Sequence, residues 1–142
     1  MTKQERAEMY RQYLADEGYS PRIDDDGDVF FKYEGRAYVI IVSERDEEFF
    51  NLLYPNFWSI ENDAERAKVI EAALYATAKT KVAKVFPTKS NTWAVIEMFC
   101  SPPETFRSVF RRSLSALRVA VENFRTKMRE VPAQSADVAQ PS

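Results

Sequence analysis

The chain has 142 residues, of which 45% are hydrophobic and 30% are charged. This composition predicts one folded domain with a substantial core and excludes global disorder. There is no histidine, and Cys100 is the single cysteine, which excludes zinc clusters, histidine-dependent nucleophiles and an intramolecular disulfide framework. We therefore expect no enzyme, no bound metal and no cofactor.

The net charge of −2 conceals two halves of opposite sign. Residues 1–65 carry 7 basic and 16 acidic residues, whereas residues 66–142 carry 13 basic and 6 acidic residues. This asymmetry favours docking of acidic on basic surface within one chain or between two copies, although it can equally mark a partner site.

The first six residues include the charged Lys3, Glu5 and Arg6 and lead into no apolar stretch, so we expect no signal peptide. No window approaches the ~18 apolar residues that a membrane span needs. The expected location is the cytoplasm, with no membrane partner.

The N-terminal part of the sequence predicts one helix followed by strands. Thr2 and Glu5 form a capping box that predicts a helix ending near Gly18. The period then changes to two, which predicts four short strands: one ending near Asp25, then residues 28–33, 36–42 and 48–54. Asp26 and Gly27 fit a tight hairpin turn between the first two strands.

A second helix is expected from the cap pair Asn62 and Glu65 to about Lys79, with Ala67, Ile70, Ala73 or Leu74, and Thr77 on its apolar side. Strands at 82–86 and 92–100 follow. Ser101 then predicts an N-cap with Pro102 at the first helical position. The third helix carries an apolar seam made of Phe106, Phe110, Leu114, Leu117, Val121, Phe124 and Met128. Residues 131–142 lack aromatics and periodicity, which predicts a disordered tail after a single domain at 1–130.

The predicted order is α-β-β-β-β-α-β-β-α, an α+β fold with an antiparallel sheet flanked by three helices. The third and last strands are apolar on both faces, so both sides of the sheet need a cover. Because three helices are few for two faces, we predict a homodimer in which a second subunit covers part of one face.

This order and several segments resemble the YbjN-like family of bacteria, whose members are described as sensory transduction regulators. The segments are Glu48 to Phe50, Tyr54 to Trp58, Thr80 to Val85, Trp93 to Glu97 and the last helix. The resemblance covers roughly residues 3 to 130 and implies a type III secretion chaperone-like fold, usually dimeric, that binds protein segments without chemistry. It implies no catalytic residue and indicates no secreted client.

Two features resemble functional sites, a calcium-binding loop and a nucleophilic cysteine, but their sequence context favours structural roles. The acidic run Asp24 to Asp28 suggests calcium, but aligning Gly27 with the loop glycine places Arg22 and Tyr33 at ligand positions. We interpret the run as a solvated hairpin turn. Cys100 ends an apolar strand without a histidine to activate it, so we expect a buried structural thiol.

Two groups of side chains are candidate sites. Arg107, Arg111, Arg118 and Arg125 each follow a seam position and form a basic stripe along the last helix. A cluster of large aromatics in turns and strand ends is the second group, and its members are Tyr54, Phe57, Trp58 and Trp93.

The preferred hypothesis is a homodimeric protein-binding module, chaperone-like or regulatory, that holds a partner protein or peptide through the sheet and its aromatic rim. The alternative is a nucleic-acid-associated accessory protein that uses the basic stripe, or that acts by holding a DNA-binding partner.

Overall fold

The computed structural model describes residues 1–130, and the predicted tail at 131–142 lies outside the described residues. The elements are α1 (Lys3–Asp16), β1 (Arg22–Ile23), β2 (Val29–Tyr33), β3 (Arg36–Ile40), β4 (Phe49–Tyr54), α2 (Asp63–Lys79), β5 (Ala83–Pro87), β6 (Thr92–Phe99), a 3-10 turn (Pro103–Thr105) and α3 (Phe106–Glu130). The predicted element order and the α+β class are therefore confirmed.

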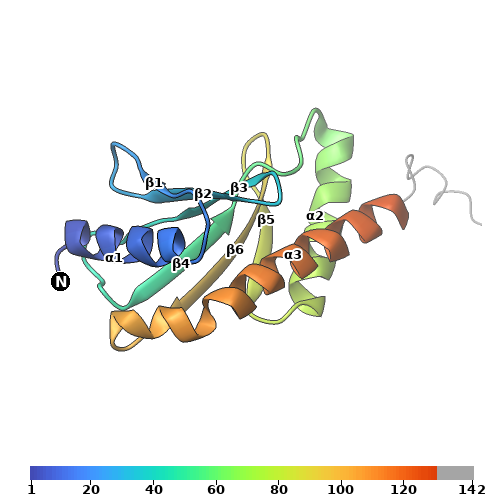
Figure 1. Ribbon diagram of the computed structural model, residues 1–142. Helices are drawn as coiled ribbons and strands as arrows, with labels where there is room; N and C mark the ends of the chain where they lie inside the picture. Colours follow the sequence, from blue (N-terminus) through green and yellow to red (C-terminus); the bar gives the residue numbers. More distant parts are fainter. Residues whose placement is uncertain (131–142) are drawn as a thin grey trace, which may run out of the picture.

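The strands form one six-stranded antiparallel sheet in the order β1-β2-β3-β4-β6-β5. The crossover places β6 between β4 and β5, so α2 lies in the connection between β4 and the edge strand β5. The sheet twists strongly from β2 to β5, and α3 crosses it diagonally (Figure 1).

Local signals in the sequence explain where the helices begin. The backbone N–H of Glu5 donates to the Thr2 hydroxyl while the Glu5 carboxylate accepts from the Thr2 N–H, which is the predicted capping box. The Asn62 side chain caps α2 by accepting from the Glu65 N–H at 2.8 Å.

The start of α3 differs from the prediction. A 3-10 turn precedes the helix, and Pro102, which has no side-chain cap bond, takes the cap position expected for Ser101. The Ser101 hydroxyl instead donates to the Glu48 carboxylate at 2.7 Å. The predicted cap residue is thus used to attach this turn to the loop before β4.

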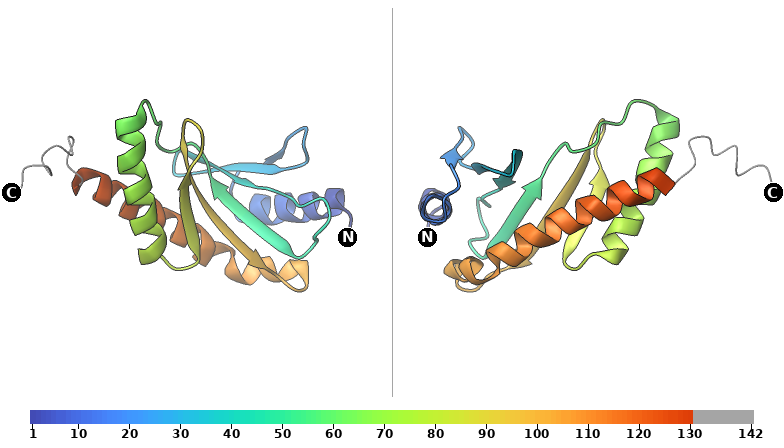
Figure 2. Two further views of the ribbon diagram at one scale, coloured as in Figure 1. Left: turned by 180° about the vertical axis from the view of Figure 1, so that it is seen from behind. Right: turned by 45° about the vertical axis from the view of Figure 1, so that its right-hand side comes forward.

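All three helices lie on one face of the sheet. Side chains of α1, α2 and α3 join the alternate, helix-side residues of β2 to β6 in one buried cluster. The seven seam residues of α3 are all buried in this cluster, which confirms the periodicity predicted for that helix. Seen from behind, β4 and β6 lie in front of α3 with no helix over them (Figure 2, left).

One whole face of the sheet is therefore left without a helix (Figure 2, left), whereas the sequence predicted that a second subunit would be needed for only part of one face. The apolar side predicted for α2 is also corrected, because Val69, Ala72, Ala73 and Ala76 are its buried residues, whereas Ile70 and Leu74 are exposed. Small alanines allow α2 to approach both α3 and β5 closely, which turns the larger side chains outward.

Candidate interaction surfaces

The four predicted aromatics do not form one site. Tyr54, Phe57 and Trp58 pack on the helix side, where the rings of Phe57 and Trp58 meet the Phe124 ring edge-on at 5.2 and 5.6 Å. The Trp58 indole N–H also donates to the Glu65 carboxylate at 3.0 Å. These three side chains therefore close the end of the core.

Trp93 points to the other face of the sheet. Its neighbour Ala94 is the residue that pairs with Tyr54, and because side chains alternate along a strand, Trp93 lies opposite to Tyr54. The indole N–H of Trp93 donates to the Asn56 side chain at 2.9 Å, which fixes the orientation of the ring. Strand alternation alone was enough to separate this residue from the other three.

The basic stripe lies along α3, but two of its arginines are paired with the acidic half of the chain. Arg111 binds the Glu17 carboxylate at 2.7 Å, and Arg118 binds the Glu34 carboxylate at 2.9 Å. Arg107 is exposed beside the Phe106 ring, and Arg125 is half-buried. Acidic surface thus docks on basic surface within one chain.

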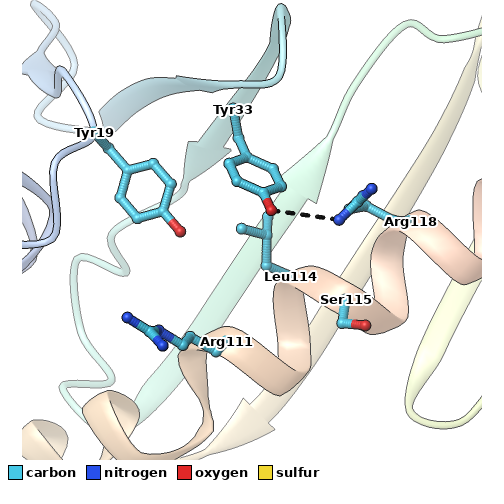
Figure 3. A pocket seen from close by; sticks show the side chains of 6 residues that line it. All are labelled: Tyr19, Tyr33, Arg111, Leu114, Ser115 and Arg118. Atoms are coloured by element: carbon cyan, nitrogen blue, oxygen red, sulfur yellow. Dashed lines mark hydrogen bonds between the residues drawn. The ribbon is translucent and has the colours of Figure 1, made fainter.

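These two ion pairs flank a pocket of about 310 Å³ between α3 and β2. Its walls are Tyr19, Tyr33, Arg111, Leu114, Ser115 and Arg118 (Figure 3). An Arg118 N–H also donates to the Tyr33 hydroxyl at 3.4 Å. Because each arginine already has a carboxylate partner, the pocket adds little net positive charge to attract a nucleic-acid phosphate.

The acidic run forms the predicted hairpin turn. The Asp24 carboxylate accepts from the N–H groups of Asp26 and Asp28, and the Asp28 carboxylate accepts from the Val42 N–H. Side-chain oxygens of Asp24, Asp26 and Asp28 lie within 4.8 Å of one another, which is the spacing a cation could use. Two of these three carboxylates already serve the backbone of the hairpin.

Cys100 is buried, and burial raises the pKa of its thiol. A raised pKa keeps the group protonated at neutral pH, so it is a poor nucleophile. This geometry agrees with a packing role at the end of β6.

The helix-free face of the sheet is the largest feature that sequence reasoning did not locate. A row of Val39, Leu53 and Val95 crosses the three central strands β3, β4 and β6 in direct register. These side chains are only 3–4% exposed because Phe30, Ile41 and Trp93 pack around them. Toward the ends of the face, Phe86 and Phe99 are 36% and 75% exposed.

The helix-free face also holds an unpaired acceptor. The side-chain oxygen of Asn51, on the central strand β4, is buried and has no hydrogen-bond partner among residues 1–130. Buried polar atoms of this kind are usually satisfied, since leaving one unpaired costs about 1–3 kcal/mol. Around the apolar centre lie the charged side chains of Arg22, Lys32, Lys84 and Glu97.

No protein-family model matches this sequence, and no curated protein matches it. Among solved structures, the chain is similar to an uncharacterized protein from Methanothermobacter thermautotrophicus. The TM-score is 0.64 at 13% sequence identity, and the match covers 88% of this chain and 97% of that chain. At this identity the likeness shows the α+β fold alone. Within residues 1–130, no helix has the length and apolar character needed to cross a membrane.

Proposed function

We propose that this protein is a non-enzymatic, cytoplasmic protein-binding module that acts as a homodimer, and that the two copies meet through the helix-free face of the sheet. The observation that carries this proposal is the face that no helix covers, on which Phe86 and Phe99 are 36% and 75% exposed beside the apolar row of Val39, Leu53 and Val95. An apolar centre with a charged rim is the usual anatomy of a protein interface. The resemblance to YbjN-like proteins and to secretion chaperones supports the same role.

A second copy is the occupant that we propose for this face. β1 lies at one edge of the sheet, and β5, whose Lys84 forms an ion pair with Glu97 of β6, lies at the opposite edge. A two-fold axis along the strand direction stacks two such faces with the β1 edge of one copy over the β5 edge of the other. The apolar row of Val39, Leu53 and Val95 in each copy then lies against the same row of its partner.

The unpaired oxygen of Asn51 supports the same arrangement. It lies on the central strand, where a stacked second sheet excludes water and offers donor side chains such as the Asn51 amide of its partner. In this dimer the helix side of each copy stays free to hold a partner segment.

Light scattering of two matched variants tests the proposal. Phe86→Glu places a charge on the helix-free face, whereas Leu74→Glu places the same charge on the exposed side of α2. We expect Phe86→Glu to lower the mass from twice 16.5 kDa to 16.5 kDa, and Leu74→Glu to leave the dimer unchanged. Equal effects of both variants, or a dimer lost only with Leu74→Glu, would contradict an interface on this face.

A further inference from the structure

A groove on the helix side of the molecule has its own chemistry. It runs between α3 and the loop that joins α2 to β5, with β6 beneath it, and has a volume of about 550 Å³. Its apolar lining consists of Val82, Met98, Val109, Ala116 and Val119. Two of these, Val82 and Val119, are 62% and 49% exposed, so large aliphatic side chains face solvent here.

The charged lining of the groove is entirely basic. Lys79, Lys81 and Arg112 border it, and no acidic residue among residues 1–130 lines it. Unlike Arg111 and Arg118, none of these three forms an ion pair with another residue in the range 1–130. Their charge is therefore available to an acidic ligand, and the interaction gains strength where the ligand excludes water.

The loop that forms one wall is held in an unusual conformation. Val82 has a φ of +53°, in the left-handed region that a β-branched residue rarely adopts. The Asn123 side chain of α3 donates to the Thr80 hydroxyl at 2.9 Å and ties the loop to the helix. Backbone strain of this kind costs of order 1–3 kcal/mol and is concentrated at binding sites. Here it presents an exposed valine to the groove.

We propose that this groove binds an amphipathic segment of a partner protein, with apolar side chains on the aliphatic floor and acidic side chains against Lys79, Lys81 and Arg112. A helical segment with apolar residues at positions i, i+3, i+4 and i+7 matches such a groove. In the part of the chain that the structure describes, no aromatic side chain lines it, so bases of a nucleic acid find no stacking surface there. This inference rests on the proposal that the chain binds protein, and it names the chemistry of the partner.

A phage-displayed library of random 12-residue peptides, panned against the full chain at about 0.15 M salt, tests the inference. We expect enrichment of peptides that combine several acidic residues with helically spaced apolar residues. A labelled peptide from this set should then bind Val119→Glu at least about tenfold more weakly in fluorescence anisotropy, because the substitution charges the apolar floor.

Two further variants separate loss of binding from loss of folding. Val82→Gly removes the exposed valine and also relieves the positive φ, so the variant folds while affinity falls several-fold. Lys81→Glu should weaken binding about fivefold, whereas the matched Arg45→Glu, in the exposed loop before β4, should change affinity less than twofold.

Several outcomes would overturn the inference. These are a library without enriched peptides, enriched peptides without acidic residues, and peptides that bind Val119→Glu as tightly as the native chain. Acidic peptides without apolar spacing would indicate general anion binding, and a fall in native mass with Val119→Glu would assign the groove to a second copy. Because Val119 and Phe86 lie on different sides of the sheet, failure here leaves the homodimer test unaffected.

Discussion

The guanidinium of Arg118 on α3 lies 2.9 Å from the carboxylate of Glu34, in the turn between β2 and β3. This ion pair joins the basic C-terminal half of the chain to its acidic N-terminal half. Both side chains are more than one-third exposed, so water and salt weaken the attraction to between about 0.2 and 1 kcal/mol.

Reversal of one charge in this pair should therefore be mildly destabilising. We expect Glu34→Lys to lower the free energy of unfolding by less than about 1 kcal/mol, with a smaller effect at high salt. The double variant Glu34→Lys/Arg118→Glu should recover most of the loss in urea unfolding. A double variant less stable than both single variants would show that the two residues do not act as a pair.

The seam of α3 should dominate stability. Phe110 and Leu117 are both fully buried, and the Phe110 ring contacts Tyr13, Tyr19 and Phe31. Phe110→Ala and Leu117→Ala should each cost about 2–5 kcal/mol in denaturant unfolding, because each leaves a cavity in the core. Val119→Ala, on the exposed side of the same helix, should stay within about 0.5 kcal/mol of the native protein. Neutral seam variants would contradict the packing described.

Removal of the Tyr38 hydroxyl should raise the free energy of unfolding. The side chain is 1% exposed, its oxygen has no hydrogen-bond partner among residues 1–130, and burial raises its pKa to about 12. Tyr38→Phe removes an unsatisfied polar group and should stabilise the fold by up to about 1–2 kcal/mol. The matched Tyr33→Phe loses the hydrogen bond from Arg118 and should gain nothing. A large loss with Tyr38→Phe would show that the hydroxyl has a partner.

Asp28 should make stability depend on pH in a defined direction. Burial raises the pKa of its carboxyl above 3.8, and this effect outweighs the hydrogen bond from the Val42 N–H. Protonation of Asp28 therefore stabilises the folded state. Its contribution to the free energy of unfolding is fully present below about pH 3.8 and is lost as the pH rises through the pKa of Asp28 in the folded protein. Asp28→Asn keeps an acceptor for Val42 but cannot ionise.

Unfolding midpoints at two pH values test this expectation. Asp28→Asn should be more stable than the native chain at pH about 7, and the difference should shrink at pH about 3, where Asp28 is protonated. The exposed Asp25→Asn is the control for the change in net charge. If the difference in stability between the native and Asp28→Asn proteins grew toward low pH, the pKa of Asp28 would not be raised by folding.

Much of the fold could be predicted because its local signals agree with one another. Caps at Thr2 and Asn62, the turn at Gly27 and the α3 seam each depend on nearby residues, and all are present as expected. Placement of the helices could not be predicted in this way. β3 is apolar on both faces, so its sequence does not say which face a helix covers.

The candidate sites could not be assembled from the sequence either, because strand register and long-range contacts decide which side chains lie together. Tyr54 and Trp93 are both large aromatics near strand ends, yet they point to opposite faces once β4 and β6 are in register. Arg111 and Arg118 are a stripe in the sequence, but long-range contacts with Glu17 and Glu34 neutralise them. The groove was missed because Val82 lies in a loop without a motif, although Val119, apolar but off the seam, was a signal.

The homodimer can be tested by light scattering of the native protein over a wide concentration range. We expect a mass of twice 16.5 kDa at micromolar concentration and moderate salt, with dissociation only on strong dilution. A mass of 16.5 kDa that persists as the protein is concentrated would contradict the homodimer and leave the helix-free face exposed to solvent.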